Sequence, residues 1–382
     1  MRTGKLNVFY DDRLVGSLVE AKDKRIAFEY SDLWINEGFS MSPRSLPLEK
    51  KVFIPTGYTF GGLFGVFSDS LPDAWGRLLL DRMLKKNGIN PDDISELDRL
   101  AIIGEDGMGA LCYKPSMKLK DELYDDLSID LDELSFSCQE LLKSKDTDNP
   151  DNLDYLYKYG GSSGGARPKV TITYDGEDWL IKFPSHIDDK DIGFIEYEYN
   201  ECAKYCGINV ADHRLFESNN CKGYFGSKRF DKKKSSDGVK RHHMLTASAI
   251  LEADFRTPCL DYNDLIRLTR ILSIDNKTEV ENMFRHMCFN VFAHNRDDHA
   301  KNFTYIYDEK KDIWLMSPAY DLTYSTTYYG EHTTSINGNG KNPTLEDIIS
   351  VAKNNNIDKR KASEIAEEIS LKVNERLNKF IK

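Results

Sequence analysis

The chain of 382 residues lacks any stretch that approaches the ~20 consecutive apolar residues of a membrane span. Its first residues, MRTGKLNVFYDDRLVG, also lack the apolar core of a secretory signal. Both absences predict a cytoplasmic protein that does not insert into a membrane. An excess of positive charge is missing as well, since the formal net charge is −11. That balance argues against a broad nucleic-acid-binding or membrane-binding surface.

Metal-binding cysteine patterns are also absent, because the seven cysteines are scattered and contain no C-x-x-C pair. Neither a disulfide framework nor a zinc site is favoured, and we expect reduced, buried thiols. Three histidines gather in one region, His286, His294 and His299, but they lack the spacing and the carboxylate pairing of a zinc site.

The residues that are present favour packed domains, with 40% hydrophobic and 11% aromatic side chains. Strand-like alternation over 1–30 predicts an antiparallel meander, and 59–85 changes to a helical period with Ser70 as a candidate N-cap. Helical periodicity dominates beyond about residue 244. We therefore predict an α+β protein of three parts, with a flexible connection at 143–153: a small α/β meander (1–118), a strand-rich part (119–243) and a mainly helical part (244–382).

Four glycines and two serines occupy 160–167, GGSSGGAR, directly before two strand-like runs joined by Asp175-Gly176. Glycines let a backbone approach an anion closely, and successive N–H groups can hold phosphate oxygens. Lys182 lies on the second run, where protein kinases keep the lysine that grips the ATP phosphates. Lys169 is a second, weaker candidate contact. A flexible linker is the alternative for the Gly-Ser run taken alone.

A second pattern begins at Asp297, which precedes Asn302 by five residues, as in the catalytic loop of protein kinases. Two short strand-like runs follow, and Asp321 comes nineteen residues after Asn302. Phosphoryl transfer needs one carboxylate near the attacking hydroxyl and an amide oxygen plus a second carboxylate to hold Mg²⁺. A hairpin would return the chain so that these groups face one cleft. Taken singly, Asp and Asn residues are common in turns, so an isolated D-x-x-x-x-N pattern is weak evidence for a catalytic loop.

Two further features fit that interpretation. The SKRF stretch at 227–230 is predicted to be the hinge over which an adenine ring lies. A glutamate of the helix predicted near 195–207 could pair with Lys182, as in kinases, although a solvated glutamate is an equal alternative at each candidate position: Glu196, Glu198 and Glu201.

With these residues in place, the chain resembles the HipA family of toxin serine/threonine kinases of type II toxin–antitoxin systems. The resemblance rests on GGARPK (164–169), IKFPS (181–185), RFD (229–231), DDHAKNF (297–303) and SPAYDL (317–322), and on FSDSLPDAWGR and IGEDGMGAL in the N-terminal part. It implies a two-lobed fold related to protein and phosphoinositide kinases. It also implies the extra N-terminal subdomain that shorter relatives lack.

Carried over residue by residue, the resemblance makes Asp297 the catalytic base and gives Mg²⁺ to Asn302 and Asp321. Asp298 competes for the role of base, but it stands only four residues before Asn302. The family regulates itself by autophosphorylating a loop serine, which is Ser162 here, or its neighbour Ser163. The residues that would contact ATP are Ser163, Gly164, Gly165, Ala166, Arg167, Lys169, Lys182, Lys228, Arg229, Phe230, His299 and Lys301.

The resemblance also implies partners. They are a protein substrate, with aminoacyl-tRNA synthetases among the family's targets, and a small helix-turn-helix antitoxin of the HipB type that brings operator DNA only indirectly. The expected function is thus that of an ATP- and Mg²⁺-dependent toxin kinase linked to persistence. Two alternatives stay open: a small-molecule kinase, and a nucleotide-binding, catalytically weak partner of a DNA-binding antitoxin.

Overall fold

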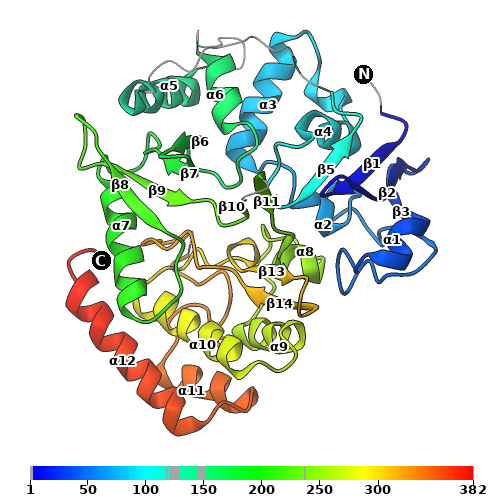
Figure 1. The fold of residues 1–382 in the computed structure, drawn as a ribbon. Coiled ribbons are helices and arrows are strands. Elements are labelled where there is room, and N and C mark those ends of the chain that lie inside the picture. Colours follow the sequence, from blue (N-terminus) through cyan, green and yellow to red (C-terminus); the bar gives the residue numbers. More distant parts are fainter. Residues whose placement is uncertain are drawn as a thin grey trace. The chain divides into compact units, whose positions relative to one another are not determined.

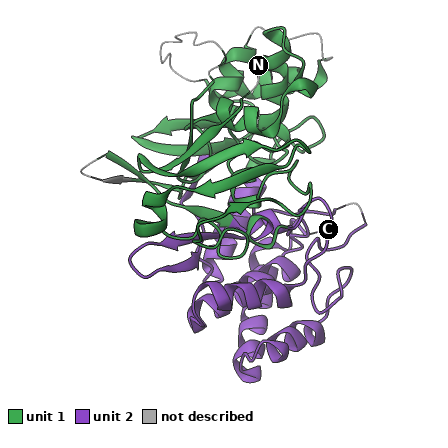
Figure 2. Cartoon of the chain, turned by 90° about the vertical axis from the view of Figure 1, so that its right-hand side faces the viewer, with its two compact units in different colours: residues 1–193, 216–245, 249–252 green, residues 194–215, 246–248, 253–382 purple. Residues whose placement is uncertain are grey.

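The computed structural model describes residues 3–117, 119, 130–144, 152–235, 238–327 and 329–381. The predicted connection at 143–153 lies largely outside these ranges. Two compact units make up the chain (Figure 2): unit 1 comprises 1–193, 216–245 and 249–252, and unit 2 comprises 194–215, 246–248 and 253–382. Among the described helices, none combines the length and the apolar character that a membrane crossing requires. The predicted three-part division remains a prediction.

Unit 1 begins with a five-stranded antiparallel sheet in the order β4-β3-β2-β1-β5 (Figure 1). Its strands are β1 (Leu6–Tyr10), β2 (Arg13–Glu20), β3 (Ile26–Tyr30), β4 (Val52–Phe53) and β5 (Leu111–Lys114). Alternate residues of β1 are buried, Leu6, Val8 and Tyr10, because successive side chains of a strand point to opposite faces. The meander predicted for the first 30 residues is confirmed.

The helices of unit 1 are mostly short. They are α1 (Asp32–Glu37), α2 (Gly65–Ser68), α3 (Ala74–Lys86), the 3₁₀ turn η1 (Pro91–Asp93), α4 (Glu96–Ile103), α5 (Leu131–Lys143) and α6 (Leu153–Gly160). Ser70 was the wrong N-cap for the helix at 59–85, since Asp73 immediately precedes α3. The Ser70 hydroxyl instead accepts a hydrogen bond of 2.8 Å from Tyr113, a residue of β5.

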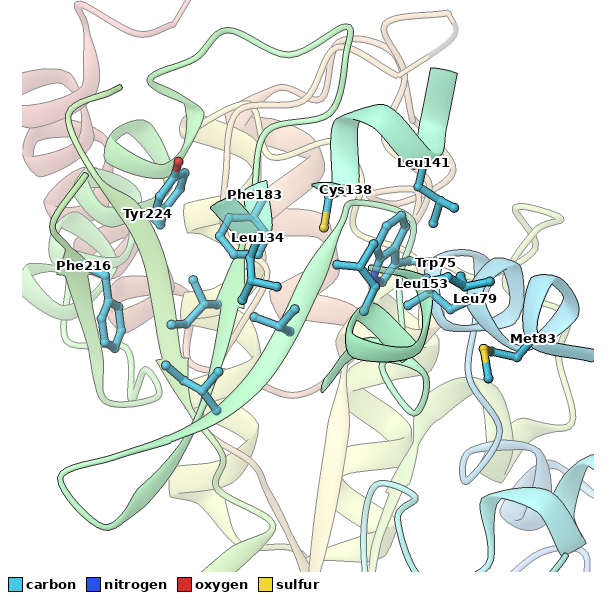
Figure 3. Packing of buried hydrophobic residues seen from close by; sticks show 14 residues of the cluster. Trp75, Leu79, Met83, Leu134, Cys138, Leu141, Leu153, Phe183, Phe216 and Tyr224 are labelled. Atoms are coloured by element: carbon cyan, nitrogen blue, oxygen red, sulfur yellow. The ribbon is translucent and has the colours of Figure 1, made fainter. Parts of the chain in front are cut away.

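A second antiparallel sheet contains β6 (Lys169–Tyr174), β7 (Glu177–Lys182) and β9 (Tyr224–Lys228). Asp175 and Gly176 form the predicted turn between β6 and β7, with φ values of 50° and 72°. Side chains of α3, α5 and α6 pack on this sheet in one hydrophobic cluster that includes Trp75, Cys138 and Phe183 (Figure 3). Helix α3 thus shares a core with the hairpin that follows the Gly-rich segment.

The remaining strands of this half of the sequence are short. They are β8 (His213–Phe216), the antiparallel hairpin of β10 (Lys232–Ser235) and β11 (Gly238–Arg241), and β12 (Met244–Thr246), which leads into α8 (Ala247–Leu251).

Unit 2 is mainly helical, as predicted for the chain beyond residue 244. Its elements are α7 (Ile192–Tyr205), α9 (Tyr262–Leu272), α10 (Lys277–Phe292), the 3₁₀ turn η2 (Ala300–Asn302), the hairpin of β13 (Thr304–Asp308) and β14 (Ile313–Met316), α11 (Leu345–Asn354) and α12 (Lys359–Leu377). Thr344 and Asp347 form a capping box at the start of α11. Helix α12 buries Ile365, Ile369, Val373 and Leu377, which recur at helical spacing.

The cysteines are all free thiols, but their burial differs from the prediction at some positions. Cys138, Cys202, Cys206 and Cys288 are buried, whereas Cys112 and Cys221 are half-buried. Cys259 is exposed, so burial was wrong for this residue.

Candidate active site

The Gly-rich loop (160–167) of unit 1 follows α6 and is folded tightly on itself. The N–H and the Oγ of Ser163 both donate to the carbonyl of Gly160, at 3.1 and 2.6 Å, and Ser163 is only 2% exposed. Ser162 is half-buried. Gly165 has a φ of 80°, and a Cβ there would lie 2.5 Å from Nζ of Lys169. Only glycine fits that position without strain.

The start of α3 lies against this loop. The Trp75 N–H donates to the carbonyl of Gly165 at 3.1 Å, and the Gly165 N–H donates to Oδ2 of Asp73 at 3.3 Å. A Cβ on Gly76 would come within 2.6 Å of the Ser163 carbonyl oxygen. The sequence pattern predicted only a helical period for this stretch. Gly76, a glycine inside a stretch with helical periodicity, could have indicated that another backbone segment packs closely there.

Lys169 and Lys182 lie directly opposite each other in the β6–β7 ladder. Both are largely buried, at 5% and 8% exposure. Lys169 Nζ donates to the Gly164 carbonyl at 2.6 Å, and Lys182 Nζ lies 5.8 Å from the centre of the Phe225 ring. Lys169 thus places an ammonium group against the Gly-rich loop, and Lys182 is its neighbour in the ladder.

Arg167, at the end of the Gly-rich loop, is engaged with a neighbouring carboxylate. Its Nε and one terminal nitrogen each lie 3.2 Å from an oxygen of Asp188, a bidentate arrangement. Burial by itself would raise the pKa of Asp188, but the Arg167 charge and the donors of Ser185 outweigh it and hold that pKa below its ordinary value. The Arg167 guanidinium thus fixes the end of the loop to the segment after β7.

The predicted hinge at the end of β9 contains a buried ion pair. Arg229 contacts both carboxylate oxygens of Asp231, at 2.9 and 2.6 Å, and Asp231 also accepts the Gly109 N–H at 2.9 Å. Burial opposes the charged form of Asp231, yet Arg229 keeps its pKa below the ordinary range. Lys228 pairs with Glu177 at 3.4 Å, and Phe230 is half-buried. The Arg229 side chain therefore stabilises the fold, and nucleotide contact by 228–230 stays a prediction.

In unit 2 the predicted catalytic loop (294–302) follows α10. His294 has a φ of 52°, which turns the chain out of the helix, and residues 296–299 then lead to η2 without regular secondary structure. The Asp297 side chain is 58% exposed, and its Oδ1 lies 4.0 Å from Nε2 of His299. Asn302 donates from Nδ2 to the Asp297 carbonyl at 2.7 Å. This bond fixes the distance between the two predicted site residues.

Asp321 belongs to a neighbouring stretch of the same unit. The hydroxyl of Tyr320 donates to the Lys301 carbonyl and lies 2.7 Å from Oγ1 of Thr304. Asp321 itself has a φ of 57°, an uncommon conformation that turns the chain at this point. Tyr320 thus holds the residue before Asp321 against the residue before Asn302. Asp321 and Asn302 therefore lie on neighbouring stretches, and carboxylate and amide oxygens are the hard ligands that Mg²⁺ prefers.

The two adjacent aspartates of the loop differ sharply in environment. Asp298 is fully buried and accepts hydrogen bonds from Tyr262 and from the Thr334 N–H, at 2.8 and 3.1 Å. A carboxylate enclosed in this way serves structure, whereas exposed Asp297 can reach another molecule. The sequence could not separate the two aspartates except by their spacing to Asn302.

His299 and Lys301 share an aromatic neighbour that the sequence analysis missed. The His299 ring centre lies 5.3 Å from that of Phe255, and Lys301 Nζ lies 4.9 Å from the same ring centre. A cation over an aromatic face is attracted by the ring quadrupole. Phe255 therefore orients two residues predicted to contact ATP. Nothing in the local sequence around Phe255 marks it for this role.

Family models match most of the chain. The HipA N-terminal domain matches residues 6–114, and the HipA-like C-terminal domain matches residues 161–377. The chain belongs to the HipA family. The contact between the Gly-rich loop and α3 thus joins the C-terminal and N-terminal domains of a HipA protein.

A relative and two solved structures extend the comparison. The "Putative kinase Y4mE" of Sinorhizobium fredii is 28% identical over 355 residues, which cover 85% of this HipA chain and 78% of the relative. HipA of Shewanella oneidensis MR-1, solved with HipB and operator DNA, superposes with a TM-score of 0.71 at 17% identity, covering 98% of this chain and 90% of that one. That likeness shows a shared mixed α/β fold. The Helicobacter pylori kinase CtkA gives a TM-score of only 0.38 at 14% identity, over 56% of this chain and 89% of that one.

Proposed function

We propose that this HipA-family chain is an ATP- and Mg²⁺-dependent serine/threonine protein kinase with the two-lobed kinase-like fold, acting as the toxin of a toxin–antitoxin module. The observation that carries the proposal is the link made by Tyr320. Its hydroxyl bonds to the Lys301 carbonyl, so Asp321 and Asn302 lie on neighbouring stretches that follow exposed Asp297. This is the set of oxygen groups that phosphoryl transfer uses.

In unit 2, Asp297 would orient the attacking hydroxyl of the substrate and accept its proton. Its exposure lets it reach a protein substrate, and the Asn302 bond to its carbonyl limits its movement. Asn302 and Asp321 would hold Mg²⁺, which neutralises phosphate charge when it is bound. His299 and Lys301, oriented by Phe255, would contact the nucleotide from the same loop.

In unit 1, Lys169 and Lys182 would neutralise charge on the ATP phosphates. The Lys169 bond to the Gly164 carbonyl supports this role, because it places an ammonium group beside the Gly-rich loop. N–H groups of the Gly-rich loop would cover the phosphates, and 227–230 would carry the adenine ring.

Autophosphorylation within the Gly-rich loop is part of the proposal. Ser162 is the preferred acceptor, because Ser163 is buried and donates its hydroxyl to the Gly160 carbonyl. Phosphate on Ser163 would require that bond to break first. Mass mapping of the phosphate distinguishes the two serines.

The partners follow from family membership. We propose a HipB-like helix-turn-helix antitoxin, supported by the HipB and operator DNA found with the Shewanella oneidensis protein. DNA would then be contacted through the antitoxin. The proposed substrate is a cellular protein, with aminoacyl-tRNA synthetases as the first class to assay.

The deciding experiment incubates the purified chain with labelled ATP and Mg²⁺ and maps the phosphate by mass. We expect label on Ser162 or Ser163, and a loss of about a thousandfold in rate for Asp297→Ala, the scale of a missing general base. Asp212→Ala is the matched control, since this aspartate is exposed and lies in the same unit. Full activity in Asp297→Ala would sink the assignment of the base.

Other outcomes select the alternatives. Saturable ATP binding without any phosphate transfer would identify a nucleotide-binding partner of a DNA-binding antitoxin. Transfer to metabolites without label on the chain or on protein would identify a small-molecule kinase. Neither binding nor label would refute the proposed function altogether.

A further inference from the structure

Residues 332–334 of unit 2, which we call the strap, enclose the carboxylate of Asp298. His332 Nδ1 lies 2.8 Å from Asp298 Oδ2, which also accepts the Tyr262 hydroxyl at 2.8 Å. The other oxygen, Oδ1, accepts the Thr334 N–H at 3.1 Å. Both Asp298 and the His332 side chain are almost completely buried. The carboxylate is therefore bonded from three directions by groups distant in sequence.

The same part of the chain also holds the backbone of the catalytic loop. Three alternate carbonyls of the loop accept hydrogen bonds from 325–334: His294 O from Ser325 N (3.1 Å), Arg296 O from Thr333 N (3.0 Å) and Asp298 O from Thr334 Oγ1 (2.5 Å). Successive side chains of an extended segment point to opposite sides. Burying Asp298 against the strap thus turns Asp297 the other way, in line with exposures of 0% and 58%.

Residues of helices α9 and α10 extend the hydrogen-bond network around Asp298. Tyr262, the first residue of α9, accepts a hydrogen bond of 2.9 Å from Nδ2 of Asn290 on α10. Asn290 Oδ1 in turn accepts Nδ2 of Asn295, in the catalytic loop, at 3.0 Å. These hydrogen bonds connect α9 to α10 and α10 to the catalytic loop. Such a network has one low-energy arrangement, because each broken bond leaves a buried polar group unsatisfied.

We propose that Asp298, Tyr262, His332 and Thr334 form a positioning set that fixes the direction of Asp297, and so couples the segment after Asp321 to the proposed catalytic base. The inference rests on the proposed function for the role of Asp297. None of the four residues is required to touch the substrate. A change in the set should therefore alter the rate of the chemical step more than the binding of ATP, since small misplacements of a reacting group are costly.

The test compares Tyr262→Phe with Tyr305→Phe. Both tyrosines are buried in unit 2. Tyr262→Phe loses the 2.8 Å bond to Asp298 and the 2.9 Å bond from Asn290, whereas Tyr305→Phe loses one bond of 2.8 Å to Thr269, which lies outside the positioning set. We expect Tyr262→Phe to lower kcat by about tenfold or more, with KM for ATP changed by less than about twofold. Tyr305→Phe should keep the kcat of the unaltered chain. Thermal melting of both variants shows whether the loss of stability is matched.

A second measurement separates this inference from the proposed function. Hydrogen exchange of the chain without nucleotide should accelerate at 294–302 in Tyr262→Phe and stay unchanged there in Tyr305→Phe. Equal kcat losses in the two variants, or equal exchange at 294–302, overturn the positioning set. If the unaltered chain transfers no phosphate, the proposed function fails, and the exchange comparison alone decides whether these residues fix the loop.

Discussion

The Gly-rich loop of unit 1 and the catalytic loop of unit 2 are held in different ways. The Gly-rich loop is bonded at its own carbonyl and N–H groups: the Gly160 carbonyl accepts from Ser163, the Gly164 carbonyl from Lys169 and the Gly165 carbonyl from Trp75. Buried side chains dominate in the catalytic loop, where Asp298 is enclosed by three other residues. The first loop is specified by where glycine is needed, and the second by the identity of individual polar residues.

This difference predicts different sensitivities to substitution. A loop held through its backbone tolerates a lost side chain, because the N–H and carbonyl groups remain. A buried carboxylate that accepts several hydrogen bonds cannot be removed in this way, since its donors stay behind without acceptors. Substitution of a buried side chain in the catalytic loop should thus lower the free energy of unfolding more than substitution of a side chain around the Gly-rich loop.

The largest expected effect is that of Asp298→Ala. Tyr262, His332 and Thr334 would each lose a buried acceptor, so we expect the free energy of unfolding to fall by about 3–5 kcal/mol. Urea denaturation followed by circular dichroism measures it. Asp212→Ala, an exposed aspartate of the same unit, is the control and should change it by less than about 0.5 kcal/mol. A similar small change in Asp298→Ala would break the comparison, because the catalytic loop would then not depend on its side-chain network.

Local sequence signals predicted much of the fold. The antiparallel meander of the first 30 residues and the Asp175-Gly176 turn each join residues close in sequence, so neighbouring side chains determine them. The order of loop, hairpin and acidic residue from Asp297 to Asp321 was readable for the same reason. Its assignment as a site remains a prediction.

Contacts between distant residues could not be predicted. Ser70 has the right residue type for an N-cap, but its hydroxyl bonds to Tyr113, 43 residues away. Asp297 and Asp298 are identical in type and adjacent, and only the partners of Asp298, 34 to 36 residues away, decide which one is buried. The residue types in the loop indicated that carboxylates are present, but the tertiary fold determines which of them is exposed and which is buried.

The second prediction concerns how acid affects the buried side chains of unit 2. His286 of α10 packs its ring 5.2 Å from that of Phe303, and burial lowers its pKa from 6.5 to about 4. The unfolded chain therefore binds the proton more readily than the folded chain does. The contribution of His286 to stability is full above pH 6.5 and is lost as the pH falls to about 4.

The expected loss from this histidine is about 3 kcal/mol, from the size of the pKa shift. Carboxylates also destabilise the fold in acid, so the measurement compares urea unfolding of the unaltered chain and of His286→Phe from pH 7 to pH 4. The variant should lack the part of the pH dependence that lies between 6.5 and 4. If the free energy of unfolding depended on pH in the same way in both proteins, protonation of His286 would not destabilise the fold.

The smallest effect is expected at the Gly-rich loop, where Asp73 supplies the side-chain contact to Gly165. Its bond to the Gly165 N–H is long, 3.3 Å, and we expect its removal to cost about 1 kcal/mol. Hydrogen exchange of 160–167 should then accelerate about fivefold in Asp73→Ala, with global unfolding nearly unchanged. Asp92→Ala, an exposed aspartate after α3, is the control. Unchanged exchange in Asp73→Ala would mean that the remaining contacts of the loop, among them those of Trp75 and Lys169, suffice to hold it. Global destabilisation comparable to that of Asp298→Ala would instead erase the difference between the two loops.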